Sequence, residues 1–170
     1  DMMALNAGRQ FDAAVAAFDV MNCAVSFERL CLACRNISSA LRPGGRFIFD
    51  VNTAVAFEWN LFDEDVTRPE DGYSHVWRGE YDPVTRIIRV TMKFYRDGEF
   101  RFGEEHVQRA HTKDEIGHAL RAAGFARVTF YNAWSMSVPD EHADRWLVCA
   151  VKEAAGRPPA EPEARGVCAQ

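Results

Sequence analysis

The chain has 170 residues, of which 48% are apolar and 26% charged, with a formal net charge of −5. This is typical of one globular domain with a substantial core. The negative charge argues against binding through phosphate neutralisation, so we expect no nucleic-acid partner, and no apolar run approaches the roughly 20 residues of a membrane span. Five irregularly spaced cysteines and no visible signal peptide predict a cytoplasmic protein with free thiols.

Two of these cysteines, Cys31 and Cys34, form a Cys-x-x-Cys pair inside an apolar stretch at 27–41. A zinc site built on such a pair normally has a second pair at ligand spacing, and the sequence contains none. We therefore expect both thiols to pack within a helix, and the sequence predicts no metal site.

The first third of the chain is typical of a βαβ unit. Residues 11–18 are apolar on both faces, as in a strand that is covered on both sides. Ser26 can cap a helix that continues to about Leu41, and we expect the Pro-Gly-Gly turn at 43–45 to end it. A second buried strand follows at 47–51. Ligands of such units gather at the carboxyl ends of the strands.

The middle of the chain predicts a short helix at 54–61 and an acidic loop at 63–72. Turn signals at 82–85 and 97–98 then separate three segments that we expect to form antiparallel strands. These segments are 74–81, 86–96 and 99–108. In the segment 86–96, apolar and polar residues partly alternate, as they do in a strand with one solvated face.

The last third begins with a capping box, Thr112-Lys113-Asp114-Glu115, which predicts a helix that Gly124 closes. Two further strands are predicted at 126–134 and 146–151. After Lys152 the sequence is rich in Ala, Pro, Glu, Gly and Arg, which favours a disordered tail at 153–170.

The order of these signals resembles the class I S-adenosylmethionine-dependent methyltransferases, in particular the subgroup that acts on small molecules. The resemblance covers about residues 1–152 and rests on the ordered set: a strand ending in Phe-Asp, a helix, Leu-Arg-Pro-Gly-Gly-Arg-Phe-Ile-Phe-Asp, and a helix ending in Ala-Ala-Gly-Phe. It implies an α/β fold with part of a Rossmann-like sheet, namely the family's strands four to seven. It also implies that the antiparallel insert at about 73–109 covers the substrate.

In this resemblance the chain begins after the family's third strand, at the acidic segment that contacts adenine. The glycine-rich cofactor loop and the acidic residue that binds the ribose have no counterpart in the sequence. We therefore expect the chain to be the C-terminal portion of a methyltransferase domain, and activity of the isolated chain is doubtful on this ground.

The resemblance also implies a set of site residues, with S-adenosylmethionine as the cofactor. It assigns cofactor contacts to Asp1 and Met2 and a substrate contact to Cys23. Phe18, Asp19 and Asn22 lie at the carboxyl end of the first strand, where we also expect cofactor contacts. Asn52 ends the second strand, and His106 and Tyr131 lie on later strands; we expect these three to contact a small-molecule substrate. A thiol is a poor general base unless its pKa is lowered, so Cys23 is not assigned a catalytic role, and the sequence names no catalytic residue.

The leading hypothesis is methyl transfer from S-adenosylmethionine to a small-molecule amine or hydroxyl acceptor, promoted by proximity and orientation. An alternative is a non-catalytic, truncated domain that acts as an interaction module. The strand at 11–18 has only one expected neighbour in the sheet, and an unpaired apolar edge favours such pairing or a homodimer. A nicotinamide-dependent oxidoreductase shares the α/β layout but suits the two C-terminal strands less well.

Overall fold

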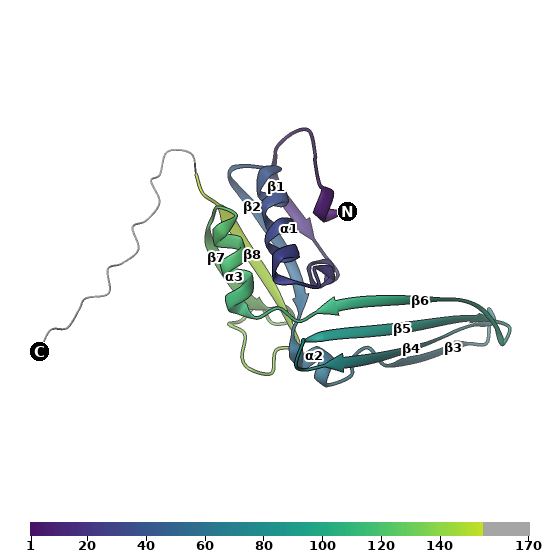
Figure 1. Cartoon of the computed structure of the whole chain (residues 1–170). Helices are drawn as coiled ribbons and strands as arrows, with labels where there is room; N and C mark the ends of the chain where they lie inside the picture. Colours follow the sequence, from purple (N-terminus) through teal and green to yellow (C-terminus); the bar gives the residue numbers. More distant parts are fainter. Residues whose placement is uncertain (155–170) are drawn as a thin grey trace, which may run out of the picture.

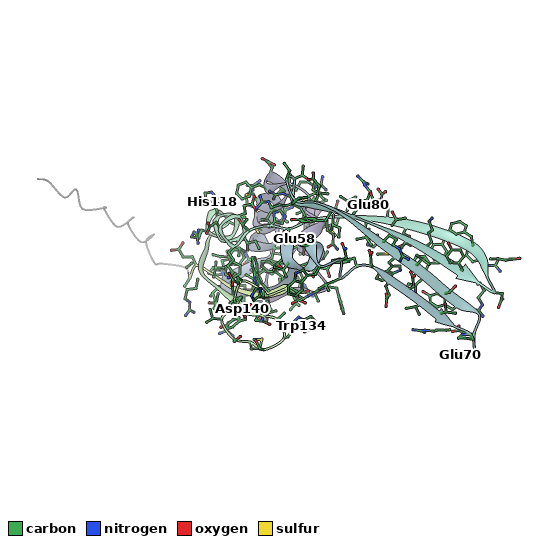
Figure 2. The ribbon with its side chains drawn as sticks, turned by 90° about the horizontal axis from the view of Figure 1, so that it is seen from below. Glu58, Glu70, Glu80, His118, Trp134 and Asp140 are labelled. Carbon is green, nitrogen blue, oxygen red and sulfur yellow. The ribbon has the colours of Figure 1, made fainter. Side chains whose placement is uncertain are left out.

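The computed structural model describes residues 1–154, which form two parts (Figure 1). One part is an α/β body, and the other is an antiparallel sheet that projects from it. In Figure 2, Glu70 lies at the far tip of the projecting sheet, whereas His118 lies on the body. The two parts meet where strands from both of them end.

The body is built on a four-stranded mixed sheet in the order β1-β2-β8-β7. Its strands are β1 (Phe11–Ala16), β2 (Leu41–Asn52), β7 (Phe125–Asn132) and β8 (Arg145–Lys152). β1 and β2 are parallel, and β8 runs antiparallel to both of its neighbours. Because β8 opposes β2, its first residue, Arg145, pairs with Asn52, the last residue of β2. The amino end of β8 therefore lies at the sheet edge where ligands of such folds gather.

Two helices, α1 (Phe27–Ser39) and α3 (Lys113–Ala122), cover one face of this sheet and contact each other (Figure 1). The alternation of β2 directs Phe47, Phe49 and Val51 into the core beneath them. The predicted capping box of α3 is confirmed, because the side chain of Thr112 and that of Glu115 each accept the other's backbone N–H. Burial of these aromatic and aliphatic side chains is the main stabilising term of the body.

The opposite face of the body sheet carries no helix within residues 1–154. The prediction that the strand at 11–18 is covered on both faces is therefore wrong for the part of the chain described: Val15 is 71% exposed, whereas Ala14 and Ala16 pack on the core. The strand also ends at Ala16 rather than at residue 18. Its edge position is confirmed for the part of the chain described, where β1 pairs with β2 alone.

The Pro-Gly-Gly segment at 43–45 does not end α1, as the sequence suggested. The helix ends at Ser39, and Leu41 already belongs to β2, fully buried and paired with Phe11. The pairing then jumps to Arg46 opposite residue 13, so the segment between forms an irregularity in the strand. Gly44 accommodates it with a φ of +77°, a conformation that favours glycine.

The projecting sheet has the order β3-β4-β5-β6, and all its pairs are antiparallel. Its strands are β3 (Glu64–Arg68), β4 (Tyr73–Asp82), β5 (Ile87–Arg96) and β6 (Glu99–Arg109). The three predicted strands are confirmed, but the predicted loop at 63–72 is wrong because β3 lies within it. Main-chain pairing with β4 overrides the polar composition of β3, and an Arg78–Asp65 ion pair of 2.6 Å reinforces it.

Short helices complete the connections. They are the 3-10 helices η1 (Met2–Ala4) and η2 (Val20–Cys23), and the helix α2 (Ala54–Glu58), which confirms the helix predicted at 54–61 in shorter form. None of the helices in residues 1–154 has the length and apolar character needed to cross a bilayer. From residue 155 onward, the tail predicted to be disordered lies outside the described residues.

Candidate functional site

β1 and β2 end where β8 begins, and β6 returns to the body at the same place (Figure 1). A group of polar side chains meets there. We call this group the strand-end cluster. It consists of Asp19, Asn22, Asp50, Asn52, Gln108 and Arg145. Four elements distant in sequence supply it, because parallel strands and an antiparallel neighbour bring opposite chain ends to one sheet edge.

Arg145 bridges two carboxylates in this cluster. Its guanidinium donates to Oδ1 of Asp19 at 3.2 Å and also to Oδ2 of Asp50. The backbone N–H of Asp19 donates to the same Asp50 oxygen at 3.1 Å, and Nε2 of Gln108 donates to Oδ2 of Asp19 at 2.5 Å. Both carboxylate oxygens of Asp19 are thus bound within the chain, which fixes the turn that follows β1.

Asn22 is fully buried and links three elements. Its Nδ2 donates to the carbonyl oxygens of Asn52 and Arg109, both at 2.9 Å, and its Oδ1 accepts the backbone N–H of Asn52 at 3.0 Å. Both amide protons are used by these bonds. The side chain therefore ties η2 to the end of β2 and to the end of β6.

Between β1 and η2 the backbone turns through two left-handed residues. Phe18 has a φ of 60° and Asp19 a φ of 49°, which is uncommon for residues with a side chain. The bonds of Asp19 offset the cost of this conformation. As a result the ring of Phe18 is 88% exposed at the carboxyl end of β1.

Cys23 ends η2 and is exposed. Partial burial of the thiol raises its pKa, and the negative charge of Asp19 raises it further. A raised pKa lowers the fraction of thiolate at neutral pH, which makes Cys23 a poor nucleophile and a poor general base.

A second polar network lies at the base of the projecting sheet. His111 is buried; its Nε2 donates to the carbonyl of Ala24 at 2.7 Å, and its Nδ1 accepts from Arg109 at 2.7 Å. Burial, partly opposed by the bond to Ala24, lowers the pKa of His111 to about 4. Burial disfavours ionisation of Glu115, but the N–H of Thr112 and the charge of Arg109 outweigh it and lower the Glu115 pKa to about 2.

A cavity of about 620 Å³ lies beside this network, between α2, the start of α3 and the loop at 139–143. Figure 2 labels Asp140 on that loop. Lys113 lies over the ring of Trp146 in its wall, 5.0 Å from the ring centroid. The cavity is mostly apolar and is separate from the strand-end cluster, none of whose six residues line it.

The structure brings together only some of the residues that the sequence singled out. Asp19, Asn22 and Asn52 meet in the strand-end cluster, and Phe18 and Cys23 flank it in the chain.

The remaining predicted residues lie elsewhere. Asp1 and Met2 belong to the N-terminal turn, where Asn36 of α1 donates to the carbonyl of Met2 at 3.0 Å. His106 is exposed on β6, 3.4 Å from a carboxylate oxygen of Glu104. Glu105 points to the opposite face of the strand, where it forms an ion pair with Arg89.

Tyr131 lies on the helix-free face of the body sheet. It lines a cavity of about 340 Å³ together with Ile48 and Cys149. Within residues 1–154, no side-chain hydrogen bond joins the residues that line this cavity to the strand-end cluster. The same holds for the residues of the N-terminal turn.

Sequence reasoning missed Gln108 and Arg145. Gln108 stands one residue before the end of β6, and Arg145 begins β8. The direction of β8 was the available signal for Arg145, because a hairpin of β7 and β8 places the first residue of β8 at the carboxyl edge of the sheet. The contact of Gln108 with Asp19 depends on the register of the projecting sheet, for which the sequence holds no local signal.

No protein-family model and no curated protein matches the sequence. Solved structures do match. An S-adenosylmethionine-dependent methyltransferase from Clostridium acetobutylicum is 26% identical with a TM-score of 0.76, over 91% of this chain and 63% of that chain.

Two further structures share the fold at lower identity. The sugar N-methyltransferase KedS8 from Streptoalloteichus is 19% identical with a TM-score of 0.69, over 90% of this chain and 60% of that one. CalS10, an amino pentose methyltransferase from Micromonospora echinaspora solved with S-adenosylmethionine bound, is 20% identical with a TM-score of 0.64, over 89% of this chain and 62% of that one.

These matches confirm the predicted fold class: an α/β fold with a mixed sheet and a separate antiparallel four-stranded sheet, corresponding to part of a methyltransferase. The chain spans between 60% and 63% of the length of these solved structures. Over that length, it is a structural match to the class I S-adenosylmethionine-dependent small-molecule methyltransferases.

Proposed function

We propose that the protein containing this chain transfers a methyl group from S-adenosylmethionine to a small-molecule amine or hydroxyl. The observation that carries the proposal is the match to the methyltransferase from Clostridium acetobutylicum, at a TM-score of 0.76 over 91% of the chain. The strand-end cluster lies at the carboxyl edge of the matched sheet, and the projecting sheet returns to the body beside it. The projecting sheet would cover the acceptor.

The residues at the end of β1 fit such a cofactor. The cofactor, when bound, supplies an electrophilic methyl group on a positively charged sulfur. Phe18 offers an exposed aromatic ring at the carboxyl end of β1, and the face of a ring attracts a cation. In this proposal Phe18 contacts the cofactor, whereas Asp19 and Asn22, whose side chains bond internally, hold Phe18 in place. Asp1 and Met2 would contact adenine, as the resemblance implies.

Methyl transfer depends on the alignment of nucleophile, methyl carbon and sulfur more than on proton transfer. The three bonds of Asn22 fix the segment that follows β1 relative to β2 and β6. The raised pKa of the Cys23 thiol argues against its serving as the base. The acceptor would therefore reach the site already nucleophilic, as a neutral amine or a polarised hydroxyl, with Cys23 and Asn52 beside it.

A second candidate function rests on a different observation. Within residues 1–154, β1 has one free edge, and Val15 on its helix-free face is 71% exposed. An unpaired edge of this kind accepts a further strand. The chain would then act as an interaction module, or form a homodimer through that edge. We also propose that the protein is cytoplasmic.

The decisive experiment is a calorimetric titration of S-adenosylmethionine into two proteins: this chain, and the longest natural chain that contains it. Micromolar binding to either one supports the methyltransferase, and comparison of the two shows whether residues 1–170 suffice. Binding to neither overturns the proposed cofactor and favours the interaction module.

A further inference from the structure

The cavity of about 620 Å³ between α2, the start of α3 and the loop at 139–143 has a buried floor. Four lining residues, none more than 4% exposed, form this floor: Thr53, Ala110, His111 and Ala143. The volume lies in the range of small-molecule sites. Because no residue of the strand-end cluster lines the cavity, its own chemistry decides what it can hold.

The polar side chains of the floor are already bonded within the chain. Oγ1 of Thr53 donates to a backbone carbonyl at 2.8 Å and accepts a backbone N–H of α2 at 3.2 Å. Both ring nitrogens of His111 are engaged, one by the carbonyl of Ala24 and the other by Arg109. A polar group of a ligand would lose its bonds to water at this floor and gain none in return. The floor therefore selects an apolar group.

The mouth of the cavity carries an excess of negative charge. Three of the lining residues that are exposed to solvent are Asp114, Asp140 and Glu141, and Figure 2 labels Asp140 on its loop. Within residues 1–154 none of these three carboxylates forms an ion pair with a lysine or an arginine, and the contact of Glu141 is with His142 at 3.6 Å. Unpaired carboxylates around one opening attract cations.

One wall joins a cation to an aromatic ring. Nζ of Lys113 lies 5.0 Å from the centroid of the Trp146 ring, whose face attracts the ammonium group. The indole nitrogen of Trp146 has almost no exposed surface, so ring carbons form its part of the wall. Arg86 is paired with Glu115 at 2.8 Å, which leaves Lys113, in the described part of the chain, to oppose the three carboxylates of the mouth. The wall thus supplies aromatic surface, and the negative charge of the mouth is only partly balanced.

We propose that this cavity binds a small organic cation. Its apolar body lies on the floor and against Trp146, and its ammonium group lies at the mouth among Asp114, Asp140 and Glu141. A carboxylate ligand would meet three like charges at the mouth. A cation without an apolar body would gain only charge attraction that water and salt screen. The inference goes beyond the proposed function, because the site involves neither the strand-end cluster nor S-adenosylmethionine.

The test is nuclear magnetic resonance of the 170-residue chain labelled with nitrogen-15, with the tryptophan indole signals assigned through Trp→Phe variants. The probe is 2-phenylethylamine, which combines an aromatic body with an ammonium group. 2-Phenylethanol and 3-phenylpropionate keep the body and carry a neutral or a negative group, and methylammonium carries the charge alone. Trp146 reports on the cavity, and Trp77, on β4 of the projecting sheet, is the control signal.

2-Phenylethylamine should produce a saturable shift of the Trp146 signal and none at Trp77. 2-Phenylethanol should bind about fivefold more weakly, and 3-phenylpropionate and methylammonium about tenfold more weakly or not at all. Absence of a saturable shift at Trp146 would overturn the inference. Binding of any of the other three compounds as tightly as the amine would overturn it as well.

A charge-neutral variant tests the mouth. Asp140→Asn combined with Glu141→Gln changes two exposed residues and should leave the fold intact. It should weaken the binding of 2-phenylethylamine about fivefold and leave that of 2-phenylethanol unchanged. The matched control is Glu70→Gln, at the far tip of the projecting sheet in Figure 2, which should change neither. Amine binding of parental strength in the double variant would refute the role of the mouth, and with it the proposed site.

Discussion

Nε2 of Gln108 donates a hydrogen bond of 2.5 Å to Oδ2 of Asp19, across 89 residues of sequence. The bond joins the projecting sheet to the turn that follows β1. Together with the bonds of Asn22 to Arg109 and of His111 to Ala24, it anchors the end of β6 on the body at three points. The position of the sheet that would cover an acceptor is therefore coupled to the segment that would meet the cofactor.

Replacement of Asn22 by Ala should lower the free energy of unfolding by about 2–4 kcal/mol. Three hydrogen bonds are lost, and the buried N–H of Asn52 is left without its acceptor. Chemical denaturation measures the change. The exposed Asn6→Ala variant is the control and should stay within about 0.5 kcal/mol of the parent chain; equal losses at both positions would show that Asn22 links nothing.

Stability should fall as the pH drops from about 6.5 to 4. The folded-state pKa of His111 is lowered from its ordinary value of 6.5 to about 4, so within this window the unfolded chain binds a proton that the folded chain does not. The shift corresponds to about 3 kcal/mol. Glu115, whose pKa falls from 4.5 to about 2, should extend the loss below pH 4.5, because its carboxylate is stabilised only while ionised.

Denaturation curves at pH 7.5 and pH 4.5 test the role of His111. The His111→Gln variant should be less stable at pH 7.5 and should lose less of its stability on acidification than the parent chain. The same change at the exposed His142 is the control. A parent chain whose unfolding free energy does not change between these pH values would contradict the buried neutral histidine.

Phe18→Ala should weaken the binding of S-adenosylmethionine about fivefold, because an aromatic contact with a cation contributes on the order of 1 kcal/mol. The ring is 88% exposed, so thermal unfolding should be nearly unchanged. The measurement is calorimetry on a chain that binds the cofactor. Phe100→Ala, on the projecting sheet, is the control, and equal weakening by both variants would exclude a contact at Phe18.

Val15→Lys should reduce self-association of the chain at tens of micromolar, as light scattering would measure. Val15 lies on the edge strand β1 and is 71% exposed, and a charge on such a strand opposes pairing with another chain. Val84→Lys is the control. Val84 is 90% exposed in the turn between β4 and β5, so the variant adds the same charge away from the β1 edge. A parent chain that is monomeric at this concentration would contradict the proposed homodimer.

Local sequence signals predicted most elements and their order. These signals act within a few residues, so the elements that they form can be predicted from the sequence. They are the apolar run at 11–18, the turns at 82–85 and 97–98, and the capping box at Thr112. The same signals failed at β3, where pairing with β4 makes a strand of a polar segment, and at 43–45, where pairing of Leu41 with Phe11 extends β2.

Some residues of the strand-end cluster could likewise be predicted from the sequence, and others could not. The sequence alone predicted Asp19, Asn22 and Asn52 as candidate residues, because polar residues at the ends of apolar strands can be read directly from the sequence. Only the tertiary structure decided that Gln108 and Arg145 join them. Those contacts span 89 and 126 residues, and they depend on the register of β6 and the direction of β8, which are set by packing of whole sheets rather than by neighbours in the chain.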